Sequence, residues 1–106
     1  MTLRIYKDAS YDFKHIRHVR YTLFVDDQYL MHYVIESFTD KNEKGIIQLL
    51  RRKVLTQPYI KSLINPTKVK YMPQGELVHE EKGTKLLKVL QIKLRVKELE
   101  EDFKDE

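Results

Sequence analysis

The sequence predicts an α+β domain: an antiparallel sheet of three or four strands, arranged as a meander, with two or three helices packed on one face. Two observations predict this class. Alternating apolar residues fill positions 19–35, as in strands with one buried face. Apolar residues at helical spacing then recur in the second half of the chain. A run of strands followed by helices is typical of α+β folds.

A β-hairpin over residues 19–35 is the clearest local signal. Burial favours a three-residue loop of Asp26, Asp27 and Gln28, because it places all the alternating apolar residues on one face. A two-residue loop would pair Leu23 with Leu30 and mix the faces. The residues expected on the buried face are Val19, Tyr21, Leu23, Val25, Tyr29, Met31, Tyr33 and Ile35. Those expected on the other, partly covered face are His18, Arg20, Thr22, Phe24, Leu30, His32, Val34 and Glu36.

The flanking strands are less marked. Residues 2–6 form a short strand candidate with Leu3 and Ile5 on one side, and residues 7–10 are expected to form a turn. Residues 11–17 then lead into the hairpin, which makes its first strand long and bulged. Residues 68–72 suggest a fourth strand, and residues 76–83 have no clear preference.

Two helices are expected in the middle of the chain. Asp40 and Glu43 have the spacing of a capping box. Pro58 can occupy the first position of a second helix, which Asn65-Pro66 would stop. The apolar residues at helical spacing in the first helix are Ile46, Leu49, Leu50 and Val54.

The last segment has two competing periodicities. Residues 90–97 alternate strictly, as in a strand, yet apolar residues from 86 to 103 also recur at helical spacing. A helix over 84–104, capped by Thr84, is favoured over a strand at 86–97 because the segment is rich in helix formers. The helix would carry two apolar stripes. One is expected to pack on the sheet and the other to meet a partner or a second copy, as a homodimer.

The composition indicates one domain over residues 1–106. The chain is 42% hydrophobic and 34% charged, which is typical of a soluble globular protein. It has no cysteine, no apolar run long enough for a membrane span and no signal peptide, so a cytoplasmic protein is expected. A single alanine among many Lys, Ile and Tyr residues indicates an AT-rich genome, such as that of a low-GC bacterium, its phage or its plasmid.

Charge is unevenly distributed. The net charge is +4, but residues 98–106 carry six acids and one base, so the remainder is strongly basic. A basic body with an acidic tail, here expected to fray, points to a polyanionic partner or to simple solubility. Candidate polyanion or partner contacts are Arg17, Arg20, Arg51, Arg52, Lys53, Lys85, Lys88, Lys93 and Arg95. Candidate contacts of the acidic tail are Glu98, Glu100, Glu101 and Asp102.

The sequence contains no recognisable catalytic or cofactor-binding motif. His18, His32 and Glu36 are the only plausible ligand set, and their spacing matches no established metal motif. The serines lack a nucleophile-elbow context, and the three glycines are scattered and form no phosphate-binding loop. We therefore expect a protein without cofactor or enzymatic activity.

Two functions compete. One is a small protein-binding inhibitor or regulator, encoded by a phage or mobile element and acting on host nucleic-acid machinery in the host cytoplasm, as anti-CRISPR proteins do. The other is a nucleic-acid-binding accessory protein that uses a basic patch. Small size and the missing catalytic motifs favour the first, whereas the positive charge favours the second.

Overall fold

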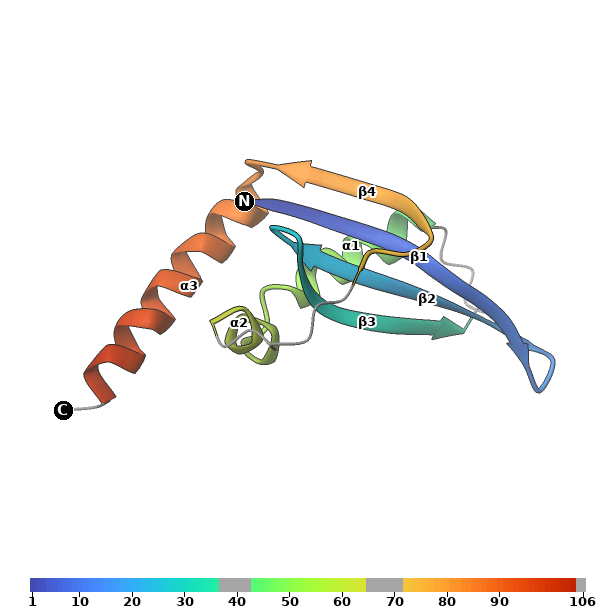
Figure 1. The fold of residues 1–106 in the computed structure, drawn as a ribbon, viewed down its shortest axis with the longest axis horizontal. Coiled ribbons are helices and arrows are strands. Elements are labelled where there is room, and N and C mark those ends of the chain that lie inside the picture. Colours follow the sequence, from blue (N-terminus) through green and yellow to red (C-terminus); the bar gives the residue numbers. More distant parts are fainter. Residues whose placement is uncertain (37–42, 65–71, 105–106) are drawn as a thin grey trace.

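The computed structural model describes residues 1–36, 43–64 and 72–104. These residues form one antiparallel sheet with strand order β3-β2-β1-β4 and three accompanying helices (Figure 1). The predicted α+β fold is confirmed, and β1, β2 and β3 form the expected meander. The strands are β1 (Thr2–Phe13), β2 (Ile16–Val25), β3 (Gln28–Glu36) and β4 (Glu76–Lys82), and the helices are α1 (Glu43–Lys53), α2 (Gln57–Ile64) and α3 (Lys85–Lys104).

One face of the sheet packs against the helices and forms the core. Strand residues on this face alternate with residues on the opposite face, so burial of one set sets the orientation of both. The sequence predicts seven core residues, of which Tyr33 is only partly buried and the other six are buried: Tyr21, Leu23, Met31, Ile46, Leu50 and Leu90. The buried core comprises Leu3, Ile5, Tyr21, Leu23, Val25, Leu30, Met31, Ile46, Ile47, Leu50, Val54, Ile60, Leu87 and Leu90.

The β2–β3 hairpin has the predicted pairing over most of its length but a different turn. Leu23 pairs with Met31 as expected, yet the loop has only two residues, Asp26 and Asp27. Both have positive φ (49° and 64°), the pattern of a type I′ turn. Leu30 is the extra residue of a bulge and restores the register.

This bulge exchanges two side chains between the faces. Leu30 joins the core, whereas Tyr29 contacts Phe24 on the opposite face, with ring centroids 6.0 Å apart. The three-residue loop and the assignment of these two side chains to the other faces were therefore wrong. The prediction did not consider a short turn combined with a bulge.

Strand β1 corrects a second prediction. The expected turn at residues 7–10 is instead continuous strand, and the chain reverses at Lys14 and His15, whose φ values are 51° and 65°. The register with β2 shifts between Lys7 and Ala9, which makes Asp8 a bulge residue. Asp8 resembles a turn residue in the sequence because bulges and turns both tolerate polar residues.

The fourth strand is β4, in the segment that had no clear preference. It pairs with β1, Thr2 opposite Lys82, and so places the last strand beside the first. The strand expected at 68–72 lies outside the described residues except for Met72, which is in no strand. The expected capping residue Asp40 also lies outside them.

Helix α3 confirms the helical interpretation of the last segment. Thr84 caps it: the Leu87 N–H donates to Thr84 Oγ1 at 3.4 Å. Leu87 and Leu90 are buried in the core, and the helix continues to Lys104 through most of the acidic segment. In Figure 1 its C-terminal half points away from the sheet.

Candidate functional site

The face of the sheet turned away from the helices carries a row of aromatic and polar side chains. We call it the open face. It is built by the strand positions that alternate with the core, so Phe24, Thr22, Arg20 and His18 follow one another along β2. Tyr6 contacts Phe24 edge-on, with ring centroids 5.6 Å apart, which extends the row onto β1.

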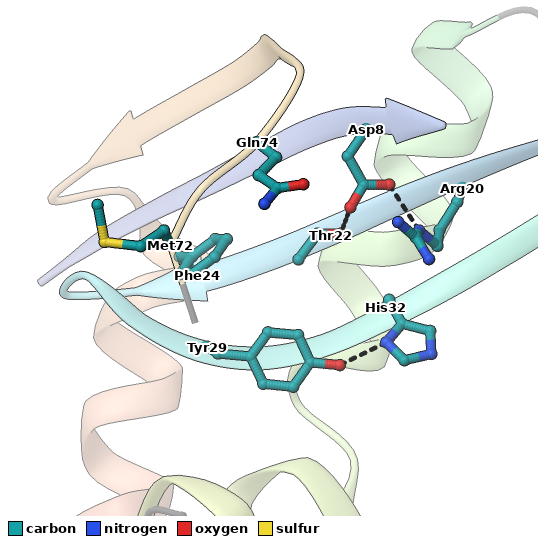
Figure 2. Close-up of a pocket in the computed structure, with 8 residues that line it drawn as sticks. All are labelled: Asp8, Arg20, Thr22, Phe24, Tyr29, His32, Met72 and Gln74. Carbon is teal, nitrogen blue, oxygen red and sulfur yellow. Dashed lines mark hydrogen bonds and ion pairs between the residues drawn. The ribbon is translucent and has the colours of Figure 1, made fainter. Parts of the chain in front are cut away.

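A depression of about 440 Å³ lies in the open face (Figure 2). Met72 and Gln74, from the segment before β4, form one wall, and Tyr29 and His32 of β3 form the other. The Tyr29 hydroxyl and His32 Nδ1 are 2.5 Å apart, which fixes the second wall. The complete lining is Asp8, Arg20, Thr22, Phe24, Tyr29, His32, Met72 and Gln74.

Asp8 organises the polar floor of the depression. The bulge in β1 turns its side chain toward β2, where its carboxylate accepts a hydrogen bond from Arg20 Nε at 2.8 Å and one from the Thr22 hydroxyl at 2.6 Å. The hydrogen bond and charge of Asp8 raise the pKa of Arg20. Both groups are thereby held in place and neutralise each other.

The far end of the β1–β2 hairpin extends this face into solvent. We call residues 10–18 the arm; it forms the right-hand tip in Figure 1. Tyr11 stacks on His18 at 5.2 Å, and Phe13 contacts the same ring edge-on at 6.1 Å. Tyr11 is 48% exposed and Phe13 57% exposed. Two large aromatic rings on the surface are a recognised feature of binding sites.

The cations of the open face are paired with acids. Arg4 contacts Asp27 and, at 3.1 Å, Glu80, while Arg20 contacts Asp8. The hydrogen bond to Glu80 raises the pKa of Arg4, and that from Arg4 lowers the pKa of Glu80. The open face is therefore rich in aromatic rings and guanidinium groups but has little excess positive charge.

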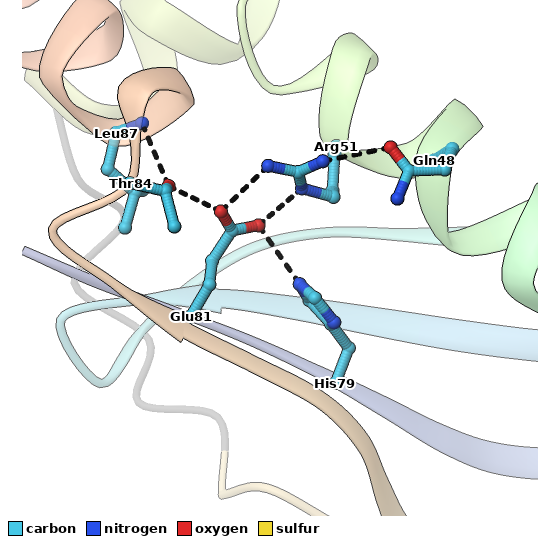
Figure 3. Close-up of polar contacts among 6 residues, drawn as sticks. All are labelled: Gln48, Arg51, His79, Glu81, Thr84 and Leu87. Carbon is cyan, nitrogen blue, oxygen red and sulfur yellow. Dashed lines mark hydrogen bonds and ion pairs between the residues drawn. The ribbon is translucent and has the colours of Figure 1, made fainter.

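A second polar cluster lies on the helix side, around Glu81 (Figure 3). Its side chain is 5% exposed and receives two hydrogen bonds from Arg51, at 2.5 and 2.9 Å. The Thr84 hydroxyl and His79 Nε2 donate to the same carboxylate, at 2.5 and 3.0 Å. Burial alone would raise the pKa of Glu81, but the hydrogen bonds from Arg51, Thr84 and His79 outweigh it and lower the pKa to about 2.

Arg51, one of the basic residues predicted from the sequence to contact a partner, belongs to this cluster. Its guanidinium binds Glu81 and Gln48, so it joins α1 to β4 and α3 and does not point to solvent. Lys53 is also engaged, with its ammonium 4.7 Å from the centre of the Tyr33 ring. Arg52 remains exposed beside them.

The other predicted contacts are divided between two regions. Arg17 donates to Ser10 on the back of the arm, at 2.9 Å, and Arg20 lines the depression. Lys93 reaches the Leu55 carbonyl, at 3.4 Å, which brings α3 beside the end of α1. The remaining predicted cations are exposed along α3: Lys85, Lys88 and Arg95.

Of the predicted acidic contacts, Glu98 and Glu100 are exposed on α3, with Glu100 3.6 Å from Lys97. Glu101 and Asp102 belong to the same helix, but their side chains lie outside the description. No cluster of three potential metal ligands is found in the described parts of the chain. His18 lies 3.6 Å from Glu36, whereas His32 binds Tyr29.

Sequence reasoning placed Arg20, Thr22, Phe24 and His32 on this face but missed the residues that β1 contributes to it. Asp8 was placed in a turn, and the aromatic pair Tyr11 and Phe13 in a lead-in segment. The signal that could have found them is the alternation of Tyr11 and Phe13 with polar residues, which continues β1 to residue 13.

Comparisons with protein-family models, with curated proteins and with solved structures found no match. Within residues 1–36, 43–64 and 72–104, no helix has the length and apolar character needed to cross a membrane.

Proposed function

We propose that this chain is a non-enzymatic protein-binding inhibitor or regulator, and that the open face and the arm form its docking surface. We further propose that a phage or mobile element of a low-GC bacterium encodes it. Its target would then belong to the nucleic-acid machinery of the host cytoplasm, as for an anti-CRISPR protein.

The observation that carries the proposal is the composition of this surface. Tyr11, Phe13, Tyr29, Met72 and Arg20 belong to the residue types that are enriched in protein interfaces. The arm exposes two of the rings, and the depression beside them can receive a side chain of the partner. Rings fixed by neighbouring contacts lose little conformational freedom on binding.

Charge pairing favours a protein over a nucleic acid on this face. Binding of a nucleic acid depends on Lys and Arg side chains that neutralise its phosphates and so release the counterions bound to them. Arg4 and Arg20 already face carboxylates, so a phosphate would have to compete with Asp8, Asp27 or Glu80. A protein partner has no such requirement, because aromatic packing supplies most of its affinity.

The test is capture of partners from an extract of a low-GC bacterium treated with nuclease. The Tyr11→Ala/Phe13→Ala variant removes the two exposed rings of the arm without opening the core. The matched control, Ile92→Ala/Leu99→Ala, removes exposed apolar side chains of α3, which are 64% and 50% exposed. We expect the wild-type protein and the control to retain the same partner, and the arm variant to lose it. Equal recovery by all three would refute docking through the arm.

A second candidate function, nucleic-acid binding, is favoured by one specific observation. The contact from Lys93 to Leu55 brings α3 beside the segment that follows α1, and Arg52 near the end of α1 is exposed, so we infer that the cations of the two helices form one basic surface. This surface predicts a mobility shift that weakens steeply with salt. It also predicts that Arg52→Gln/Lys88→Gln/Arg95→Gln reduces the shift, whereas the arm variant leaves it unchanged.

A further inference from the structure

Helix α3 carries a line of apolar side chains that no other described part of the chain covers. We call it the outer stripe: Val89, Ile92, Val96 and Leu99, which are 41%, 64%, 50% and 50% exposed. The inner side of the helix is already occupied, because Leu87 and Leu90 are buried in the core and Leu86 and Leu94 pack against it. The outer stripe is therefore a separate surface.

The spacing of the outer stripe is that of a coiled-coil seam. Its residues lie three and four positions apart, which keeps them on one side of an α-helix. A hollow of about 160 Å³ on this side is lined by Ile92, Lys93, Val96, Lys97 and Glu100. Coiled coils are held together by side chains of one helix that insert into such hollows on the other.

The charges beside the outer stripe indicate which helix can pair with it and in which orientation. Lys93 flanks the stripe on one side of Val96, and Glu100 flanks it further toward the C-terminus. A parallel copy would place Arg95 against Glu100 but also Lys88 against Lys93 of the second copy, so attraction and repulsion would offset each other. An antiparallel copy with Val96 opposite Leu99 instead places Lys93 near Glu100 of the second copy. The two-fold symmetry then forms this pair twice.

The body of the protein leaves room for this arrangement. The C-terminal half of α3 projects away from the sheet and from α1 (Figure 1). In the antiparallel register with Val96 opposite Leu99, the two helices overlap over residues 91–104 only. The sheets therefore lie at opposite ends of the paired helices, with the open face and the arm far from the contact.

From the uncovered stripe, the hollow and the charge order, we propose that two copies of this chain associate through the outer stripes of α3, in antiparallel orientation. This assembly does not rest on the proposed function, which uses the other end of the molecule. The overlap is about two heptads, short of the three to four of a stable coiled coil, so the dimer dissociates on dilution.

The first test is the mass in solution, measured by sedimentation equilibrium from about 10 μM to about 1 mM, a range suited to a weak dimer. We expect the mass to rise from the monomer value of 12.8 kDa toward twice that value. Ile92→Gln/Leu99→Gln should remain monomeric, with an unchanged circular dichroism spectrum, because both residues are exposed in the monomer. A wild-type protein that stays monomeric at the highest concentration overturns the proposal.

Charge reversal tests the orientation. Lys93→Glu places an acid against an acid, and Glu100→Lys places a base against a base, so each variant alone should dimerise about tenfold more weakly. An equimolar mixture of the two should recover dimerisation. Lys85→Glu is the matched control, because it makes the same charge change outside the overlap. A dimer that is equally stable in all three variants refutes the antiparallel pairing.

Cross-linking gives an independent measure of the orientation, because the chain contains no cysteine. Val96→Cys mixed with Leu99→Cys should form a mixed disulfide in the antiparallel dimer. Parallel helices would place each cysteine opposite its own copy, so disulfides within each single variant, without the mixed product, would contradict the proposal.

Discussion

Glu81 is the residue at which three elements of the fold meet. It belongs to β4, its carboxylate binds Arg51 of α1, and it accepts a hydrogen bond from Thr84, which caps α3. A buried carboxylate is costly unless hydrogen bonds satisfy it, and here four donor contacts converge on two oxygens. This carboxylate therefore links α3 to the sheet and to α1, in addition to the burial of Leu87 and Leu90 in the core.

Removing this charge should lower the stability of the protein. Glu81→Gln keeps the shape but leaves Arg51 without its anion, and we expect a loss of about 3 kcal/mol in the free energy of unfolding at pH 7. Urea denaturation measures this loss. The matched control is Glu80→Gln, which makes the same change at the exposed neighbouring residue and should leave stability nearly unchanged.

The dependence of stability on pH should reflect the titration of Glu81. The pKa of Glu81 is about 2 in the folded protein and about 4.3 in an unfolded chain. Because folding lowers this pKa, its contribution is complete above about pH 4.3 and is lost as the pH falls toward 2. Glu81→Gln should therefore lose less stability than the wild-type protein between pH 5 and about pH 2. Parallel curves for the two proteins would contradict the role assigned to Glu81.

Gly75 is a second residue that the structure requires, because its backbone conformation and its surroundings both exclude a larger side chain. Its φ is +82°, and a Cβ added there would lie 2.6 Å from the Cα of Asp8 and would also overlap the Lys7 carbonyl oxygen. Gly75→Ala should therefore displace the bulge in β1 and lower the free energy of unfolding by about 3 kcal/mol. Gly83→Ala is the control, since Gly83 has a similar φ but open space around it, and should cost only about 1 kcal/mol. Equal losses would show that φ alone determines the effect.

The two hairpins show how short turns shape the larger elements. Lys14 and His15 at the end of the arm, like Asp26 and Asp27 in the β2–β3 turn, adopt the positive φ values of a type I′ turn. Type I′ turns strongly favour Asn-Gly, so neither sequence is optimal. The β2–β3 turn is held by a hydrogen bond from the Thr2 N–H to Asp26, at 2.7 Å.

Replacing the arm turn by Asn-Gly should stabilise the arm locally. We expect Lys14→Asn/His15→Gly to gain about 1–2 kcal/mol in protection of the arm amides, because Asn and Gly adopt positive φ at lower cost. Amide hydrogen exchange is the appropriate measurement, since an arm can open without global unfolding. Asp26→Asn/Asp27→Gly is the comparison: it should gain less, because it removes the contact between Asp27 and Arg4. Faster exchange in the arm variant would contradict the assigned turn.

At the scale of the whole molecule, the chain is longer than a compact domain of its size. Its radius of gyration is 15.3 Å, against about 13 Å for a typical domain of this length, and its extents are 54 × 28 × 21 Å. The arm and the end of α3 account for the difference, and they project from opposite ends (Figure 1). The two proposed contacts, with a protein partner and with a second copy, can therefore form at the same time.

The acidic end of α3 should weaken any binding of polyanions to the basic body. Replacing Glu98, Glu100 and Glu101 by Gln and Asp102 by Asn removes four negative charges while keeping Leu99 and Phe103. We expect tighter binding to single-stranded DNA, chiefly at low salt, where screening is weak. Fluorescence anisotropy at two salt concentrations measures it. Unchanged affinity at low salt would show that the acids only solubilise the chain.

The alternation of residues 19–25 and 31–35 was enough to predict the sheet face and most of the register, because burial of one face permits only one alignment. It could not predict that Leu30 bulges, since a two-residue turn with a bulge and a three-residue turn align Leu23 with Met31 equally well. Asp8 was misassigned for a related reason. Its place in a strand depends on Arg20 and Thr22, which lie more than ten residues away.

The charged cluster around Glu81 was also beyond sequence reasoning. Residues 76–83 contain three acids and one lysine, which resembles a solvated loop, and they form a strand only because β1 pairs with them. Arg51 was assigned to the surface because nothing local connects it to Glu81, thirty residues further along. The helix at 84–104 was predictable, because its cap and its apolar spacing are local signals.

The pairing of the first strand with the last has a consequence for synthesis on the ribosome. Residues 2–36 can form the β1–β2–β3 meander as soon as they emerge, since both hairpins are local. The free edge of β1 stays unpaired until β4 has been made, because Thr2 pairs with Lys82. During that interval an exposed strand edge is open to wrong partners, the usual origin of aggregation in nascent sheets. Slow decoding of residues 37–75 would lengthen this vulnerable stage, and fast decoding would protect the chain.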